Sequence, residues 1–276
     1  MNKKILIAVG VVVFILLAAK VVLSWKVAAP QKKGTQVSTA VSAANLYQQG
    51  MAFEANDELA EAQAAYKKVV SDYSDFDKIE EAQKKLEAVN MRIILSATET
   101  PSTTVYIVQH GDSLAKIAKK NNTTIDLIKK SNSLSSDMIR VGAHLRLWKG
   151  VFSVYVDKSQ NTLMLKSDND IVKVYSISTG KNNCTPVGTF TIVNKTVNPV
   201  WFKEGGKVIP PESPENILGT RWMGFNDPYG SYGIHGTTEP EKIGKQVTAG
   251  CVRMRNNEVE ELYTLLPEGT QVTIVD

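Results

Sequence analysis

The chain has 276 residues, of which 43% are hydrophobic and 22% charged, a composition that is typical of folded domains and excludes a wholly disordered protein. This length accommodates two domains or a few small ones. The 32 basic and 28 acidic residues give a net charge of +4, too mild to indicate nucleic acid as a partner. Two cysteines and three histidines exclude a disulfide-rich scaffold and a zinc-finger cluster.

Residues 1–26 combine a positively charged start with a long apolar run. Two lysines precede an apolar stretch over residues 5–23 that only Lys20 interrupts, and Trp25 follows it. About twenty apolar residues suffice to span a bilayer, and tryptophan favours its interface. We predict an uncleaved signal anchor, a transmembrane helix, with a linker over residues 27–41. A removed signal peptide is the alternative.

Residues 42–96 place apolar side chains at spacings of three and four, the pattern of amphipathic helices. The run Leu46-Tyr47-Gln48-Gln49-Gly50, followed by Ala62, Tyr66 and Tyr73, resembles one tetratricopeptide-type unit. One such unit buries its apolar face poorly, so it would need a third helix or a partner. We predict a helical, TPR-like spacer that contacts another protein. A plain helical spacer is the alternative.

A small module follows a polar linker over residues 97–104. Residues 105–149 begin with a β-rich run and then carry two helical faces, which Ser113 and Thr124 precede as candidate caps. The alternating Leu145-Arg146-Leu147 closes the module as a second strand. The pattern predicts a compact βααβ unit.

This module resembles the LysM family. The matching residues are the run 106–118, the tripeptide 132–134 and the run 139–145. LysM modules bind N-acetylglucosamine-containing glycans, usually peptidoglycan, in a groove between the first strand–helix loop and the second helix–strand loop. The resemblance therefore implicates five residues in glycan binding: Gly111, Asp112, Ser113, Asn132 and Ile139. Asp112 and Ser113 have an alternative role as helix-capping residues.

Residues 150–276 contain short β-rich runs separated by turn signals about every ten residues, which favours a sandwich or barrel. One helical face near the end consists of Val259, Leu262, Leu265 and Leu266. Asn257 followed by Glu260 resembles a capping box for that helix. We predict a mostly-β catalytic domain with one helix near its C-terminal end.

Candidate chemistry in this region rests on one thiol and one imidazole. A cysteine reacts as the thiolate, and its ordinary pKa of about 8.5 calls for a base. His235 is the only histidine after residue 144, so it is the imidazole available to Cys251. Gly250 allows backbone N–H groups to turn inward as oxyanion donors. Arg253 can meet a substrate carboxylate or stabilise the thiolate.

Over residues 152–276 the sequence closely resembles the L,D-transpeptidase (YkuD-type) family, through the motifs at 185–190, 218–223, 233–237 and 248–254. The resemblance implies that His235 deprotonates Cys251, that the Gly236 carbonyl orients the imidazole, and that amides near Gly250 hold the oxyanion. It implicates further residues in substrate binding: Arg253, Thr248, Tyr232, Arg221 and Trp222. Thr248 stands where many members have Ser, and Ala249 where many have His or Lys.

In this family the cysteine attacks the carbonyl between the L- and D-centres of a tetrapeptide stem, releases D-alanine, and passes the acyl group to an amine. The resemblance therefore implies a 3→3 peptidoglycan cross-linking enzyme with no metal and no organic cofactor. Three alternatives are open: an L,D-carboxypeptidase, an enzyme that attaches a protein to the wall, and a non-catalytic peptidoglycan-binding scaffold. Because peptidoglycan lies outside the cytoplasmic membrane, we expect residues 27–276 there, in the periplasm or cell wall, on a single-pass anchor.

The second cysteine, Cys184, lies in a polar turn. A disulfide with Cys251 would consume the nucleophile. We expect Cys184 to be unpaired.

Overall fold

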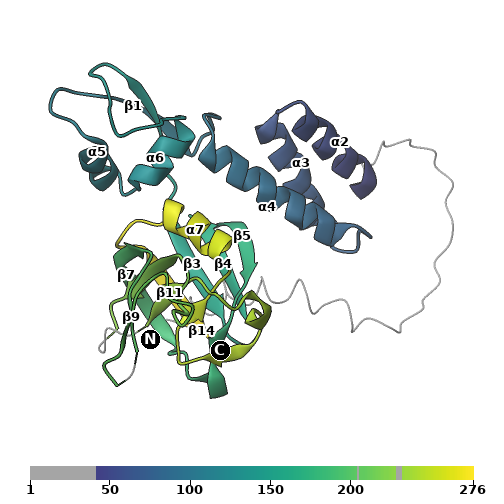
Figure 1. Ribbon diagram of the computed structural model, residues 1–276. Coiled ribbons are helices and arrows are strands. Elements are labelled where there is room, and N and C mark those ends of the chain that lie inside the picture. The colour runs from purple at the N-terminus through teal and green to yellow at the C-terminus, as the bar shows by residue number, and fades with distance from the viewer. Residues whose placement is uncertain (1–41, 204, 228–231) are drawn as a thin grey trace, which may run out of the picture. The chain divides into compact units, whose positions relative to one another are not determined.

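A computed structural model of the chain describes residues 42–203, 205–227 and 232–276 (Figure 1). The predicted transmembrane helix over 1–26 and the linker over 27–41 lie outside these ranges. Within them, the helices are too short or too polar for any one of them to span a membrane. The chain forms two compact units, one ending at Lys84 and the other beginning at Lys85.

The first unit is helical, as the sequence pattern predicts. It contains α2 (Ala43–Ala55), α3 (Leu59–Asp72) and the first turns of α4 (Ile79–Leu95). α2 packs against α3 through Tyr47 and Tyr66, whose ring centroids lie 5.9 Å apart and whose side chains are fully buried. The helical pattern predicted over residues 42–96 therefore corresponds to α2, α3 and α4.

The second unit includes a βααβ segment, which confirms the predicted element order. Its elements are β1 (Thr103–Ile107), α5 (Leu114–Lys120), α6 (Ile125–Ser131) and β2 (His144–Trp148). β1 and β2 pair antiparallel. Both predicted caps form: Ser113 Oγ accepts the Lys116 N–H at 3.3 Å, and Thr124 Oγ1 accepts the Leu127 N–H at 2.9 Å. Side-chain oxygens at these positions satisfy amides that a helix start leaves without partners.

Buried polar contacts tie this segment to its neighbours within the second unit. The Arg146 guanidinium on β2 donates to the carbonyls of Ile93, Ile94 and Thr98 at 2.8–2.9 Å, at and just beyond the C-terminal end of α4. Desolvation lowers the pKa of Arg146, and these three carbonyls compensate the buried cation. Leu127 of α6 belongs to the same apolar core as the large sheet.

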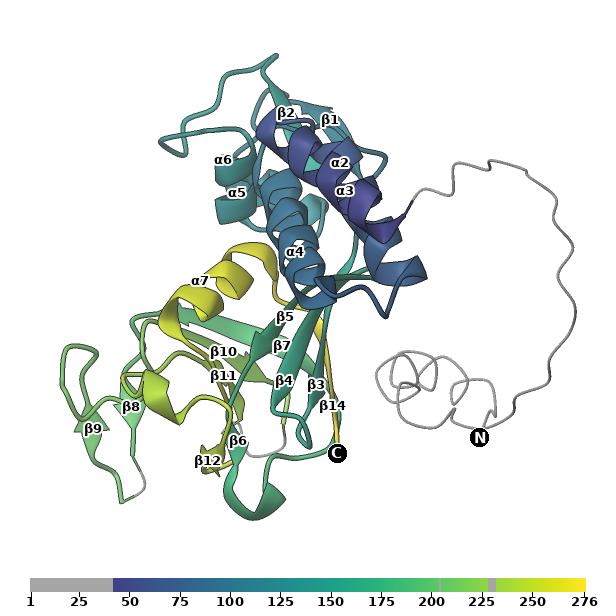
Figure 2. The same ribbon diagram turned by 90° about the vertical axis from the view of Figure 1, so that its right-hand side faces the viewer.

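The large sheet has eight strands in the order β13-β11-β10-β7-β14-β3-β4-β5. The strands are β3 (Phe152–Asp157), β4 (Thr162–Ser167), β5 (Asp170–Ser176), β7 (Gly188–Val197), β10 (Arg221–Phe225), β11 (Gly233–His235), β13 (Val252–Arg253) and β14 (Gln271–Val275). It forms a β half-barrel, so the prediction of a mostly-β domain is correct. The helix α7 (Asn256–Leu265) lies beside β10 and β11 (Figure 2).

The apolar face predicted for the C-terminal helix is confirmed, because Val259, Leu262 and Leu265 are fully buried in the core. The predicted capping box is wrong. Arg255 occupies the N-cap and makes no side-chain cap bond. The helix begins two residues earlier than expected, with Arg255 in place of Asn257 at the N-cap.

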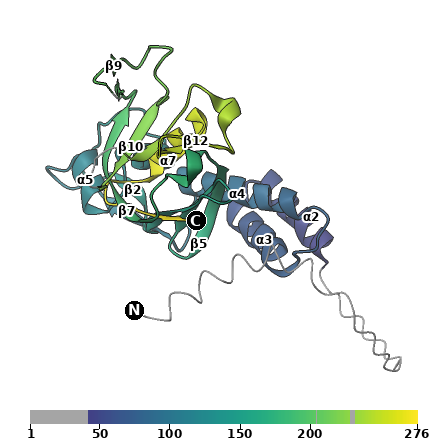
Figure 3. The same ribbon diagram turned by 90° about the horizontal axis from the view of Figure 1, so that it is seen from below.

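Two small sheets complete the unit. β6 (Thr179–Gly180) pairs in parallel with β12 (Gln246–Thr248), and β8 (Trp201–Phe202) pairs with β9 (Val208–Ile209). The β8–β9 hairpin projects from the large sheet (Figure 3). Two short 3₁₀ helices adjoin the small β6–β12 sheet along the chain. η2 (Lys181–Asn183) follows β6, and η3 (Pro240–Lys242) precedes β12.

We predict that Arg146→Met destabilises the end of α4. The substitution leaves three carbonyls without their donor, at a cost of about 1–3 kcal/mol in the free energy of unfolding. Denaturant unfolding, with hydrogen exchange at Ile93–Leu95, measures the effect. The exposed Arg140→Met provides the control. Equal stability of the two variants would contradict the capping role of Arg146.

Candidate active site

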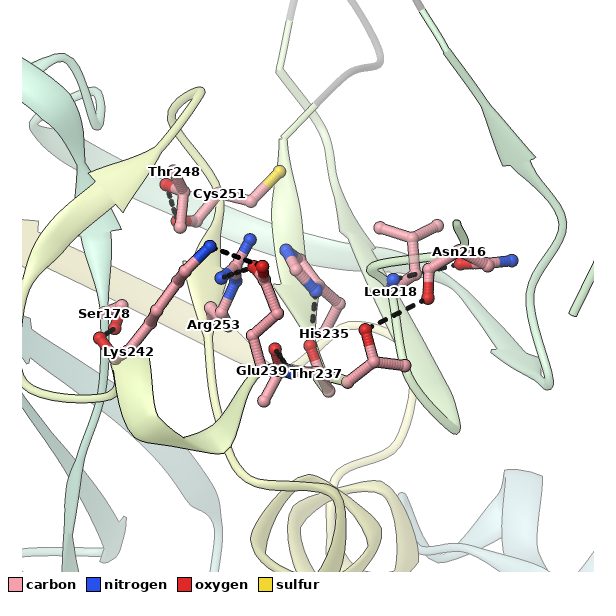
Figure 4. Close-up of polar contacts among 12 residues, drawn as sticks. Ser178, Asn216, Leu218, His235, Thr237, Glu239, Lys242, Thr248, Cys251 and Arg253 are labelled. Carbon is pink, nitrogen blue, oxygen red and sulfur yellow. Dashed lines mark hydrogen bonds and ion pairs between the residues drawn. The ribbon is translucent and has the colours of Figure 1, made fainter. Parts of the chain in front are cut away.

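A short parallel pairing of β11 with β13 brings the predicted functional residues together. Ile234 pairs with Val252, and His235 pairs with Arg253. Cys251 directly precedes β13 and lies two residues before Arg253, so alternation places the thiol and the guanidinium on one face of the strand, the face on which the paired His235 also lies. In Figure 4 the side chains of Cys251 and His235 extend to the same side of these strands. The structure thus brings the predicted nucleophile and base into one site.

His235 is held in one orientation. Its Nδ1 lies 2.6 Å from the Gly236 carbonyl oxygen. A carbonyl can only accept, so Nδ1 carries the proton and Nε2 is left as the basic nitrogen. The Trp222 ring stacks on the imidazole at 6.1 Å between centroids. The histidine is 2% exposed, and both contacts restrict its rotation.

Burial lowers the pKa of His235 to about 4, and the charge of Arg253 adds to this. Hydrogen bonding to the Gly236 and Leu218 backbones acts in the opposite direction. Burial also raises the pKa of the Cys251 thiol to about 11. Hydrogen bonding to the Gly233 backbone and the charge of Arg253 offset part of that rise. Between these two values the site holds a neutral thiol beside a neutral imidazole.

The turn before Cys251 is shaped by Thr248 and Gly250. The Thr248 hydroxyl donates to the Cys251 carbonyl at 2.7 Å and accepts the Gly250 N–H at 3.2 Å. Gly250 has φ +130°, and a Cβ there would meet the Tyr232 ring at 2.4 Å. Only glycine fits this position without displacing the ring. The hydroxyl that Thr248 shares with Ser therefore has a structural task in the nucleophile turn.

The Gly250 amide, expected to serve as an oxyanion donor, is engaged with Thr248 in this structure. Tyr232 takes part in the site through its ring, which covers Gly250. Its own N–H donates to Asp227 Oδ2 at 3.1 Å. These contacts fix the wall of the site beside the thiol.

Arg253 is buried, with 4% exposure, so it does not present an open guanidinium to a ligand. Its Nη1 donates to Glu239 Oε2 at 3.0 Å. The other oxygen of Glu239 accepts from Lys242 Nζ. The sequence analysis missed Glu239 and Lys242. The signal that could have found Glu239 is its place shortly after His235, since a buried arginine requires a nearby carboxylate.

Arg221 is not brought to this site. Strand alternation turns it to the face opposite Trp222, where it lies 3.7 Å from Glu260 and over the Tyr263 ring on α7. Its side chain therefore contacts α7, and its implied role in substrate binding stays a prediction. Trp222 lies at the site, as expected, with its Nε1 donating to Asn194 at 2.9 Å.

Asn256, which the sequence analysis also missed, braces the segment that carries His235. Its Oδ1 accepts the N–H of Thr237 at 2.9 Å and that of Thr220 at 3.2 Å. A Cβ on Gly219 or Gly236 would meet this oxygen at 2.1 Å. The close packing of these backbones fixes the direction in which the Gly236 carbonyl points.

Neither cysteine forms a disulfide, as expected for Cys184. Cys184 is exposed and follows η2, and its Sγ lies against Gly180, which is paired with Thr248 in the β6–β12 sheet. In the described ranges, no group of three or more His, Cys, Asp or Glu is arranged to hold a metal ion.

The side chains implicated in glycan binding have contacts within their own module. Asp112 Oδ2 accepts from the Tyr106 hydroxyl and the Gln109 N–H at 2.9 and 2.8 Å, so it braces the first loop instead of capping a helix. Asn132 bonds both backbone groups of Arg146 at 2.7–2.8 Å. The remaining three differ in role: Ser113 caps α5, Ile139 packs on the module's core, and Gly111 has φ +83° with open space around it. Glycan contact by these loops stays a prediction.

Comparison with known proteins assigns both modules. Residues 152–274 match the L,D-transpeptidase catalytic domain, and residues 106–148 match the LysM domain. YqjB of Bacillus subtilis, named as an L,D-transpeptidase, is 45% identical over 128 residues, which cover 45% of this chain and 70% of that protein. The chain belongs to the L,D-transpeptidase family.

Two further L,D-transpeptidase-type proteins align with most of their length. YkuD of Bacillus licheniformis is 33% identical over 62% of this chain and 98% of its own length. YkuD of Bacillus subtilis is 32% identical over 61% of this chain and 97% of its own. As an enzyme of this family with a LysM domain, this L,D-transpeptidase acts on peptidoglycan and carries a peptidoglycan-binding module.

We predict that Cys251 is alkylated slowly at neutral pH. In a Cys184→Ser background, the iodoacetamide rate should rise steadily from pH 7 to pH 10, because the thiolate population grows toward its pKa of about 11. A rate that is fast and independent of pH from about pH 5 upward would indicate a preformed thiolate–imidazolium pair and would contradict the neutral pair.

We predict that Gly250→Ala lowers kcat/KM on the order of a hundredfold, because the new Cβ displaces Tyr232 and the nucleophile turn. Gly244→Ala is the matched control: φ is +90° there too, but nothing lies within 4 Å of the added atom. Steady-state kinetics of both variants measure the difference. Equal losses would show that backbone strain, and not the contact with Tyr232, is responsible.

Proposed function

We propose that this L,D-transpeptidase forms 3→3 peptidoglycan cross-links through a thioester on Cys251. The observation that carries the proposal is the β11–β13 pairing, which brings His235 and Cys251 together at one edge of the large sheet. The Gly236 carbonyl fixes the orientation of the imidazole there. A thiol and an imidazole in this arrangement support acyl transfer without a metal.

The first half-reaction starts from the neutral pair. As Cys251 Sγ attacks the carbonyl carbon between the L- and D-centres of a tetrapeptide stem, its proton moves to His235 Nε2. The oxyanion is held by amides of the Gly250–Cys251 turn, and the Gly250 amide joins them on exchanging its bond with Thr248. The intermediate collapses when His235 returns the proton to the amine of the departing D-alanine. A thioester on Cys251 remains.

The second half-reaction reverses these roles. An acceptor amine from a second stem gives a proton to His235 Nε2 and attacks the thioester carbonyl. The carbon–sulfur bond breaks, and the histidine reprotonates Cys251. A low pKa of His235 suits this cycle because the imidazole is neutral, and thus able to accept a proton, across neutral pH. Trp222, stacked on the ring, restricts the rotation of the imidazole during this cycle.

We propose that the other parts of the chain hold the catalytic domain at the cell wall. In this proposal the loops of the LysM domain around Gly111–Ser113 and Asn132–Ile139 bind the glycan strand. A single-pass anchor over residues 1–26 would hold the enzyme at the cytoplasmic membrane with the catalytic domain outside it. The helices from residue 42 onward, TPR-like in sequence, are proposed to contact a partner protein.

Tetrapeptide muropeptides test this proposal. We expect the parent enzyme and Cys184→Ser to yield a dimer that has lost one D-alanine, and Cys251→Ala to yield none, as mass spectrometry can measure. Tripeptide monomer without dimer would indicate an L,D-carboxypeptidase, because water would be the acceptor. Transfer only to a protein amine would indicate a protein-attachment enzyme. Unchanged substrate with a folded parent would indicate a binding scaffold. Equal loss in both cysteine variants would contradict a single nucleophile.

A further inference from the structure

The acidic residue Glu239 stands next to the proposed catalytic pair and has no part in the chemistry described above. It directly precedes η3, and its side chain makes no helix-cap bond there. Instead its carboxylate bonds Arg253 Nη1 with one oxygen and Lys242 Nζ with the other. Figure 4 shows the contacts from both cations meeting at this carboxylate.

Arg253 depends on this carboxylate. A buried guanidinium is costly unless a counter-charge accompanies it. Glu239 is its ion-pair partner in the described part of the chain, and the Arg253 Nε is buried there without a hydrogen-bond partner. The backbone of Arg253 is fixed by two bonds with Ser178 at 2.8 and 2.9 Å. Among the described residues, the ion pair and hydrogen bond with Glu239 therefore hold the guanidinium in place.

The chain places Glu239 firmly. Its N–H donates to Thr237 Oγ1 at 2.9 Å, and the Thr237 N–H donates to Asn256 Oδ1 at the start of α7. The hydrogen bond from Lys242, with a smaller contribution from Arg253, lowers the pKa of Glu239, so the carboxylate is charged at neutral pH. The charged Glu239 carboxylate thus pairs with the Arg253 guanidinium from a segment whose backbone is held in place.

We propose that Glu239 is a positioning residue for the cysteine chemistry, in which its carboxylate holds the buried guanidinium of Arg253 beside His235 and Cys251. Glu239 acts through the arginine and touches no reacting atom. The inference deepens the proposed function and rests on it for its consequence in catalysis. A guanidinium released from Glu239 would move toward water, because no other carboxylate of the described residues forms an ion pair with it.

The arginine is the link to the reacting pair. Its charge lowers the pKa of both His235 and Cys251. The groups that act on the pair come from each neighbouring element: Arg253 from β13, Asp227 after β10, and Cys184 after η2. Glu239 contacts Arg253 directly, so its influence on the pair passes through the arginine. Arg221 of β10 faces α7 instead.

The alkylation profile of Cys251 against pH tests the proposal, in a Cys184→Ser background and whether or not the enzyme forms cross-links. In Glu239→Gln we expect the profile to move to higher pH by about half a unit or more, because the arginine leaves and its stabilisation of the thiolate is lost. Glu239→Asp keeps the charge and should stay close to the parent. The matched control is Glu215→Gln, which removes a carboxylate paired with Lys207 at 2.7 Å and should leave the profile in place.

The direction of the shift separates the explanations. A shift to lower pH would show that Glu239 acts directly as a nearby negative charge, and no shift would show that it is only a structural ion pair. Either result overturns the proposal. Arg253→Gln should shift the profile upward as Glu239→Gln does, and the double variant should go no further. Additive shifts would overturn the path through the arginine.

Two readouts complete the experiment. Thermal unfolding establishes that each variant is folded; should Arg253→Gln not fold, the contrast between Gln and Asp at position 239 decides the matter. In cross-linking assays, Glu239→Gln should lower kcat on the order of tenfold with little change in KM. A parent that alkylates as expected but forms no cross-links would refute the proposed function and leave the positioning of Arg253 to be judged from the profile.

Discussion

The parallel pairing of β11 with β13 is the constraint on which the site depends. Two short strands, Gly233–His235 and Val252–Arg253, pair at the end of an eight-stranded sheet. Their inward side chains, Ile234 and Val252, are fully buried, and the register they set places His235 next to Arg253. Because side chains alternate along a strand, core packing on one face fixes the reactive groups on the other. A slip of one residue would exchange the two faces.

Burial then decides the ionisation of this site. Removing His235 from water keeps its imidazole neutral, and burial keeps the Cys251 thiol protonated. An enzyme with this resting pair needs no buried ion pair before substrate arrives, and the proton transfer coincides with nucleophilic attack. The charge of Arg253 acts on both groups, and the carboxylate of Glu239 makes the burial of that charge tolerable.

Local patterns in the sequence predicted the helices from residue 42, the βααβ module with its caps at Ser113 and Thr124, and the mostly-β class of the rest. The order and spacing of the motifs were enough to pair His235 with Cys251. Long-range partners were out of reach: Glu239 and Asn256 act through contacts that only the folded chain creates. The shared motif of Arg221 and Trp222 could not tell that the two side chains face opposite sides of the strand, Arg221 toward Tyr263 and Trp222 toward His235.

The most direct test of the account is to trap the acyl-enzyme. Parent enzyme mixed with a tetrapeptide stem donor, quenched in acid and digested, should yield one modified peptide under mass spectrometry. The account predicts that this peptide contains Cys251 and carries the stem without its terminal D-alanine, joined through a thioester that hydroxylamine removes. An adduct on Cys184, or product formed by an enzyme that lacks the Cys251 thiol, would contradict it.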